Sequence, residues 1–127
     1  MLELSEQSLE QDTHVITVRG ELDVGSAGPF TRALNAAVEA RRCVVLDFAD
    51  LTFIDSTGMM VLLGGLRRVE RGGGCLVVAC TNPTVLRIFA LTGMDKTFSI
   101  ETMRQRAIDL ARDTIERRAS ESRGSGE

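Results

Sequence analysis

The sequence is poor in the side chains on which many enzymes and metal sites depend. Its 127 residues include no tryptophan, no tyrosine and one histidine, His14, and aromatic residues make up 4% of the chain. The core must therefore be built from aliphatic side chains, methionine and five phenylalanines. His14 stands in a strand-like segment with no obvious serine or cysteine partner, so we expect neither a catalytic triad nor a histidine-based metal cluster.

Positive charge and long apolar runs are also scarce. The formal net charge is −3 at pH 7, whereas nucleic-acid-binding domains usually carry a basic face. The arginine cluster of Arg67, Arg68 and Arg71 is interrupted by Glu70, which is typical of a solvated helix face. No apolar run approaches ~18 residues and no basic-then-apolar leader opens the sequence. We therefore expect a cytoplasmic protein with no membrane span, no direct contact with nucleic acid, no cofactor and no bound metal.

The three cysteines, Cys43, Cys75 and Cys80, lie in or beside strand-like apolar segments. Their number is odd and no C-x-x-C pair occurs. Buried, reduced thiols are the interpretation that this pattern favours.

Strand-like and helix-like segments alternate along the chain. Short apolar stretches predict strands at residues 2–9, 14–18, 44–48, 75–79 and 97–100. Apolar residues at helical spacing predict helices at residues 27–41, 57–70 and 82–92, and from Thr102 onward. This alternation predicts a single α/β domain with a mainly parallel sheet of four or five strands, about four crossover helices and an antiparallel N-terminal edge strand. We expect the domain to span residues 1–118 and a disordered polar tail to cover residues 119–127.

Motifs that would support catalysis are incomplete. Ser56 lacks the preceding glycine of a nucleophile elbow. The aspartates that follow strand-like segments, as in a Mg²⁺-dependent phosphoacceptor site, are Asp23, Asp47, Asp50 and Asp55. Such a site needs a lysine on a later strand, and Lys96 is the sole lysine. We therefore expect no enzymatic activity.

The segment from Leu51 to Gly65 is the most informative part of the chain. It presents Asp55, Ser56 and Thr57 directly before an apolar, helix-like run. Short side-chain oxygens at that position cap a helix, and the positive end of the helix dipole tolerates an anion there. A hydroxyl at this place can therefore carry a phosphate without unfolding the helix. On residue chemistry alone, an ordinary N-cap is the simpler interpretation of Ser56.

Three motifs carry a family resemblance. Leu51-Thr-Phe-Ile-Asp-Ser-Thr-Gly58 resembles the signature of the STAS domain found in bacterial anti-sigma factor antagonists. Val18-Arg-Gly-Glu-Leu-Asp23 is similar to the second strand and following loop of that family, and Cys43-Val-Val-Leu-Asp-Phe-Ala-Asp50 to the strand that leads into the signature. The resemblance covers roughly residues 10–115 on the usual domain length, and it implies a STAS-like fold.

The resemblance also implies a regulatory function. In the family, a serine at the position of Ser56 is phosphorylated by a partner anti-sigma factor kinase. The unphosphorylated chain would thus bind an anti-sigma factor serine kinase and free a sigma factor, phosphorylation would switch it off, and a separate phosphatase would reset it. The partner-binding residues implied by the motif match and by exposure at the helix start are Asp23, Val24, Asp55, Ser56, Thr57, Gly58, Met59 and Met60.

Several alternatives remain open at this point. Asp23 is also a typical turn-forming residue, and core packing is equally expected for one member of the Met59–Met60 pair. The chain would alternatively be a STAS-like accessory subunit of a lipid-transport or membrane-transporter complex, with Ser56 or Thr57 as contact residues. A small-ligand or nucleotide sensor is a third, weaker alternative.

Overall fold

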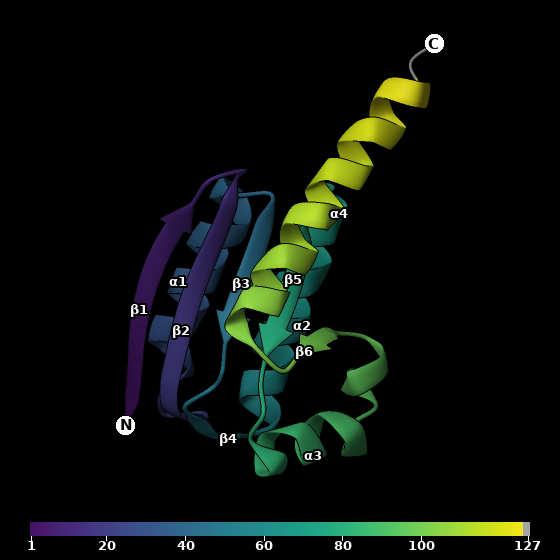
Figure 1. The fold of residues 1–127 in the computed structure, drawn as a ribbon. Coiled ribbons are helices and arrows are strands. Elements are labelled where there is room, and N and C mark those ends of the chain that lie inside the picture. The colour runs from purple at the N-terminus through teal and green to yellow at the C-terminus, as the bar shows by residue number, and fades with distance from the viewer. Residues whose placement is uncertain (126–127) are drawn as a thin grey trace.

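A six-stranded mixed sheet organises the fold (Figure 1). The computed structural model describes the backbone of residues 1–125 and the side chains of residues 1–121. The strands are β1 (Leu2–Leu9), β2 (Thr13–Leu22), β3 (Cys43–Asp47), β4 (Leu51–Ile54), β5 (Cys75–Ala79) and β6 (Ser99–Glu101). The sheet order is β1-β2-β3-β5-β6, with β4 paired to the end of β2. Only the β1–β2 pair is antiparallel among these strands, which confirms the predicted α/β sheet with an antiparallel N-terminal edge.

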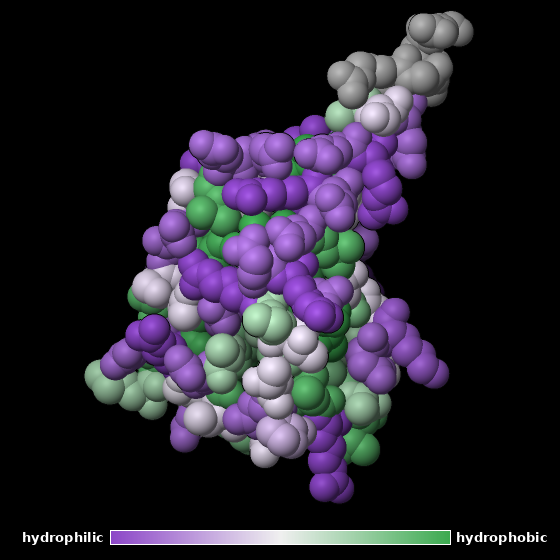
Figure 2. Space-filling model, in the orientation of Figure 1, coloured by the Kyte–Doolittle hydropathy of each residue, from purple (hydrophilic) through white to green (hydrophobic). Residues whose placement is uncertain are grey.

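Helices cover both faces of the sheet. α1 (Ala27–Ala40) and α2 (Ser56–Arg71) lie on one face, and α4 (Arg104–Ser125) crosses the other (Figure 1). α3 (Pro83–Leu91) lies near β4 at the end of the sheet where α2 begins, and a short 3-10 helix, η1 (Met94–Lys96), connects α3 to β6. Figure 2 shows hydrophilic side chains along the outward face of α4, with hydrophobic surface on either side of it. The three-layer arrangement buries β3 and β5 on both faces, as their continuous apolar sequences predict.

Two apolar clusters form the core, one on each face of the sheet. Alternate residues of β3 serve the two clusters: Val44 and Leu46 face α1 and α2, whereas Cys43 and Val45 face α4. The larger cluster extends through α3 to Phe89 and Phe98, whose rings pack edge to face with their centroids 5.6 Å apart. The side of the sheet that carries α2 therefore holds most of the apolar burial.

A glycine lets α1 and α2 approach closely. A Cβ atom on Gly65 would lie 2.6 Å from Cδ2 of Leu34, whereas one on Gly64 would meet open space. The sequence indicates a close backbone approach at this glycine pair, and Gly65 alone provides it.

Three segments differ from the predictions. β2 continues to Leu22, beyond the predicted strand 14–18, and β4 forms within the signature itself. α4 begins at Arg104, two residues after the predicted cap Thr102, and runs to Ser125. The predicted disordered tail 119–127 is therefore helical through Ser125, and residues 126–127 lie outside the described residues. Ala107, Ile108 and Ala111 of α4 are buried in the core cluster on its face of the sheet, and the same helix continues into the predicted tail.

The expectation of three reduced thiols is wrong for two of the cysteines. Cys43 and Cys75 face each other in the parallel register of β3 and β5, with their Cα atoms 4.5 Å apart, and form a disulfide. Cys80 is free and buried, and burial raises the pKa of its thiol. The sequence does not reveal strand register, so the neighbouring positions of Cys43 and Cys75 were not predictable from it.

Candidate functional site

Asp55 and Ser56 occupy the start of α2, but their roles differ from the simplest interpretation. Asp55 is the N-cap: its backbone is extended and its Oδ1 accepts a hydrogen bond from the Gly58 N–H at 3.0 Å. Ser56 is the first residue of the helix and its side chain is exposed. The interpretation of Ser56 as the N-cap is therefore wrong, because the neighbouring carboxylate caps the helix. The Ser56 hydroxyl is not needed to start α2.

The same carboxylate joins α2 to the loop that follows β2. Asp55 Oδ2 accepts a hydrogen bond from the Val24 N–H at 3.1 Å, and the Asp55 N–H donates to the Leu22 carbonyl at 3.1 Å. Two segments about 30 residues apart in the sequence thus meet beside Ser56. Asp55 holds both of them at once.

Asp23 shapes the loop from within. Its Oδ1 accepts from the N–H groups of Gly25 and Ser26 at 3.0 and 3.1 Å, which makes it a turn-forming aspartate. Its side chain is half-buried. The next residue, Val24, is 77% exposed and projects from this turn. Asp23 therefore presents Val24 next to the start of α2.

Two residues of the predicted partner-binding set lie beneath the surface. Gly58 is buried, and a Cβ atom there would lie 2.9 Å from both Leu22 and Ile54. Met59 is 5% exposed and belongs to the core, whereas Met60 is 64% exposed. Met59 is thus the member of the methionine pair that packs in the core, and the partner-binding role of Gly58 and Met59 stays a prediction. Residues four apart share a helix face, so Ser56 and Met60 point outward together while the residues between them turn inward.

Exposed apolar side chains lie on segments at the end of the molecule where α2 begins (Figure 1). Phe53 of β4 and Leu91 at the end of α3 are 41% and 74% exposed, in addition to Val24 and Met60. A groove of about 160 Å³ with apolar walls opens beside the hydroxyl, between α2 and the segment that follows α3. The residues that line this groove, hereafter the methionine groove, are Ser56, Met59, Met60, Leu63, Thr92 and Met94.

Sequence reasoning missed most of this apolar surround. Phe53 could have been predicted from the sequence, since it lies in the signature three residues before Ser56. Thr92 and Met94 come from a distant part of the chain and line the groove with α2 only in the folded protein. No local pattern reports that contact.

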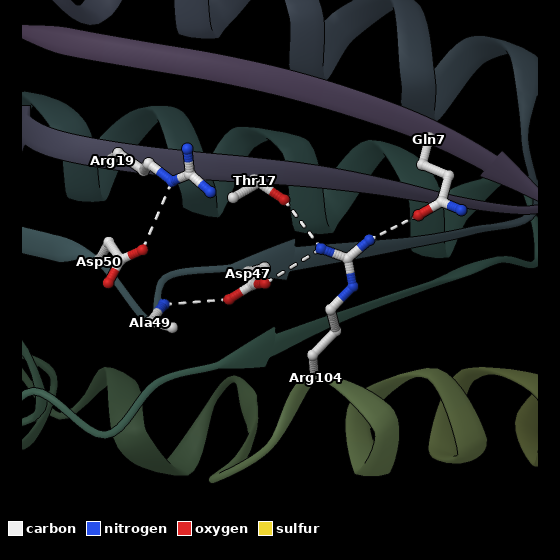
Figure 3. A network of polar contacts seen from close by, with 7 residues as sticks. All are labelled: Gln7, Thr17, Arg19, Asp47, Ala49, Asp50 and Arg104. Carbon is white, nitrogen blue, oxygen red and sulfur yellow. Dashed lines mark hydrogen bonds and ion pairs between the residues drawn. The ribbon is translucent and has the colours of Figure 1, made fainter.

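A separate polar network fixes α4 on the opposite face of the sheet (Figure 3). The Arg104 guanidinium donates to Gln7 Oε1 at 2.7 Å, Thr17 Oγ1 at 3.1 Å and Asp47 Oδ2 at 3.2 Å. The other oxygen of Asp47 accepts from the Ala49 N–H at 3.0 Å. Asp47, 7% exposed, is thus a structural ion-pair partner, and Arg104 links α4 to three neighbouring strands.

The aspartates considered above for a Mg²⁺-dependent site have separate partners. Asp47 pairs with Arg104, Asp50 Oδ2 lies 3.4 Å from Arg19 Nε, and Asp55 caps α2. Among the side chains that the structure describes, no group of three or more His, Cys, Asp or Glu is arranged to hold a metal ion. Within the same part of the chain, no helix combines the length and apolar character required to cross a bilayer.

Comparison with known proteins places this geometry in a family. The STAS domain model matches residues 7–107. The anti-sigma F factor antagonist of Paenibacillus polymyxa is 31% identical over 88 residues, which are 68% of this chain and 75% of that relative. The solved structure of the anti-sigma factor antagonist SpoIIAA in its unphosphorylated form superposes with a TM-score of 0.76 and 26% identity, and the alignment covers 87% of this chain and 97% of that one. For Bacillus SpoIIAA in its phosphorylated form the TM-score is 0.68 at 25% identity, with 84% of this chain and 97% of the other covered. The chain therefore belongs to the STAS domain family and is homologous to bacterial anti-sigma factor antagonists.

Proposed function

We propose that this protein is an anti-sigma factor antagonist controlled by reversible phosphorylation of Ser56. In the unphosphorylated form it binds an anti-sigma factor that is also a serine kinase, and this binding frees a sigma factor. The observation that carries the proposal is an exposed serine hydroxyl at the first position of α2, on a helix that Asp55 caps independently. The relatives support it, since they include anti-sigma factor antagonists and a structure of one in a phosphorylated form.

The phosphorylation step is an ordinary phosphoryl transfer. The Ser56 Oγ attacks the γ-phosphorus of ATP bound to the kinase, the new O–P bond forms, and the bond to the bridging oxygen of ADP breaks. The hydroxyl proton passes to a base of the kinase, and ADP leaves. A phosphatase later hydrolyses the ester, which returns serine and inorganic phosphate.

Electrostatics allow the modified chain to stay folded. A phosphate adds about −1.5 to −2 charges at pH 7. At the start of a helix this charge is stabilised by about 0.3–1 kcal/mol through the helix dipole. Like charges brought together at an interface cost several kcal/mol, and about 1.4 kcal/mol is a tenfold change in affinity. Phosphorylation should therefore release the partner without unfolding the domain.

The proposed partner-binding face combines exposed and supporting residues. Val24, Ser56 and Met60 are exposed at its centre. Asp23 and Asp55 hold the loop and the helix start in place, and the half-buried Thr57 lies at the edge. Gly58 and Met59 support this face from the core side, because Gly58 packs against Leu22 and Ile54 and Met59 packs in the core, which fixes the position of the first turn of α2.

Incubation with an anti-sigma factor kinase from the same genome and ATP tests the proposal directly. We expect the mass of the intact protein to rise by one phosphoryl group and peptide mapping to place that group on Ser56. Thr57→Ala serves as the matched control and should still accept phosphate, whereas Ser56→Ala should not. An unmodified protein, or phosphate on a different residue, would contradict the proposal and favour the transporter-subunit alternative, in which this serine is only a contact.

A further inference from the structure

The methionine groove opens directly beside the proposed phosphorylation site. Ser56, Met60 and Leu63 contribute from α2, while Thr92 and Met94 close the groove from the segment after α3. Three of the five methionines in the chain line it. Methionine is flexible and polarizable, and it is over-used at surfaces that adapt to a partner.

The size of the groove restricts what can occupy it. Its volume is about 160 Å³, whereas small-molecule sites typically measure about 300–1,000 Å³. Ser56 and Thr92 are among the lining residues, but the exposed wall surface is apolar, and the Thr92 hydroxyl donates to the Ile88 and Phe89 carbonyls. The walls therefore offer little to orient a polar ligand. One large apolar side chain, delivered by a protein surface, fits both the volume and the chemistry.

The surroundings indicate a protein surface around that side chain. Val24, Phe53 and Leu91 are exposed apolar residues from the loop after β2, from β4 and from the end of α3. Val24 is hydrogen-bonded to Asp55, beside Ser56 in the chain. Leu91 directly precedes Thr92 of the groove. Contacts of this kind exclude water from a central anchor in protein interfaces. The groove and these neighbours together have the anatomy of an interface core.

Charge argues against a second copy of this chain as the occupant. A twofold contact through this face brings identical patches together. The face around Ser56 carries the Asp55 carboxylate, next to it in the chain, and the Asp23 carboxylate in the loop that Asp55 holds. A symmetric contact with its axis near Ser56 would bring these acids close to their copies. Such like-charge juxtaposition is unfavourable, and a different protein with an uncharged or basic rim is the better fit.

We propose that the methionine groove receives one large apolar side chain of the anti-sigma factor, an inference that rests on the proposed function. Ser56 is one of the residues that line the groove, so the anchor side chain would pack against the residue that carries the phosphate. A phosphate on the Ser56 oxygen must then lose water against apolar walls, and burial of an uncompensated charge is strongly unfavourable. Desolvation thus adds to charge repulsion in releasing the partner.

Methionine methyl NMR tests the inference on the full chain. The protein is labelled at its methionine methyl groups and titrated with an anti-sigma factor kinase from the same genome in the presence of ADP. Met103 is 57% exposed and does not line the groove, so its signal is the internal reference. We expect the Met60 and Met94 signals to shift or broaden on binding while the Met103 signal stays in place.

Matched substitutions supply the affinity measurement. Met60→Gln and Met94→Gln place a polar group in the groove at similar length, and Met103→Gln makes the same chemical change outside it. We expect the Met60→Gln, Met94→Gln double variant to bind about tenfold more weakly or worse by calorimetry, and Met103→Gln to bind like the unchanged protein. A melting curve on each variant confirms that it is folded.

The outcomes separate this inference from the proposed function. Suppose that Ser56→Glu abolishes binding, but the Met60 and Met94 signals do not change on binding and the glutamine variants bind like the unchanged protein. The proposed function then stands and the groove inference is overturned. If the unmodified protein fails to bind any such kinase, both are overturned. Shifted groove signals together with weakened groove variants support the inference.

Discussion

Asp55 offers a quantitative test of how the candidate site is held together. Its two carboxylate oxygens accept separate hydrogen bonds, one from the Gly58 N–H within α2 and one from the Val24 N–H in the loop after β2. Asp55→Ala removes both acceptors. Asp55→Asn leaves one carbonyl oxygen, which can cap the helix but cannot also hold the loop.

The expected losses of stability follow from these two bonds. Loss of an N-cap costs about 1 kcal/mol, with a range of about 0.5–2. The loop bond adds about 0.5–1.5 kcal/mol. We therefore expect Asp55→Ala to lower the free energy of unfolding by about 2 kcal/mol and Asp55→Asn by about 1 kcal/mol.

Urea denaturation followed by circular dichroism measures the difference. With an m-value of about 1–3 kcal/mol per M, the alanine variant should unfold at a urea concentration lower by roughly 1 M, and the asparagine variant by about half as much. Kinase binding should fall in both variants, because Val24 loses its fixed position. Equal midpoints for the alanine variant and the unchanged protein would refute the assignment of Asp55 as the link between helix and loop.

Three further predictions follow from the contacts of the site and the core. Ser56→Glu should bind the kinase at least about tenfold more weakly while Ser56→Ala still binds, and equal affinities in a titration would argue against a charge-operated switch. Arg104→Ala should lower the free energy of unfolding by about 2–3 kcal/mol, less than the 3–5 kcal/mol of a fully buried pair because its side chain is 38% exposed. Arg19→Ala breaks an exposed ion pair and should lower the free energy of unfolding by less than about 1 kcal/mol in the same urea assay. Equal losses for Arg104→Ala and Arg19→Ala would contradict the role of Arg104 in holding α4 on the sheet. Gly65→Ala should lower the free energy of unfolding by about 1–3 kcal/mol through overpacking against α1. Gly64→Ala places its methyl group in open space and should raise the free energy of unfolding by up to about 1 kcal/mol. A higher melting temperature for Gly65→Ala than for Gly64→Ala would rule out the close approach of α1 and α2.

Local chemistry made much of the fold predictable. The continuous apolar runs of β3 and β5 indicated strands buried on both faces, and they are. Asn82 caps α3 through Thr84 and Val85, and Pro83 takes the first helical position, as that dipeptide predicts. Features that depend on a residue and its near neighbours were therefore accessible from the sequence.

Features that depend on distant neighbours were not. β4 has only four residues, too few to show a period, and it exists because the end of β2 offers a pairing edge. The disulfide depends on the register of β3 and β5. In the candidate site, Ser56 is exposed and one member of the Met59–Met60 pair packs in the core, as the sequence allowed. Which methionine turns inward depends on the packing of α2, and the methionine groove depends on the segment after α3.

The direction of α4 has a practical consequence. Arg104 fastens the first turn of this helix to β1, β2 and β3, and the helix then leads away from the end of the molecule where α2 starts (Figure 1). A fluorophore or surface tether attached near Glu121 would sit remote from Val24, Ser56 and Met60. Binding and release of the proposed partner can thus be measured on an immobilised or labelled molecule whose proposed partner-binding face is left untouched.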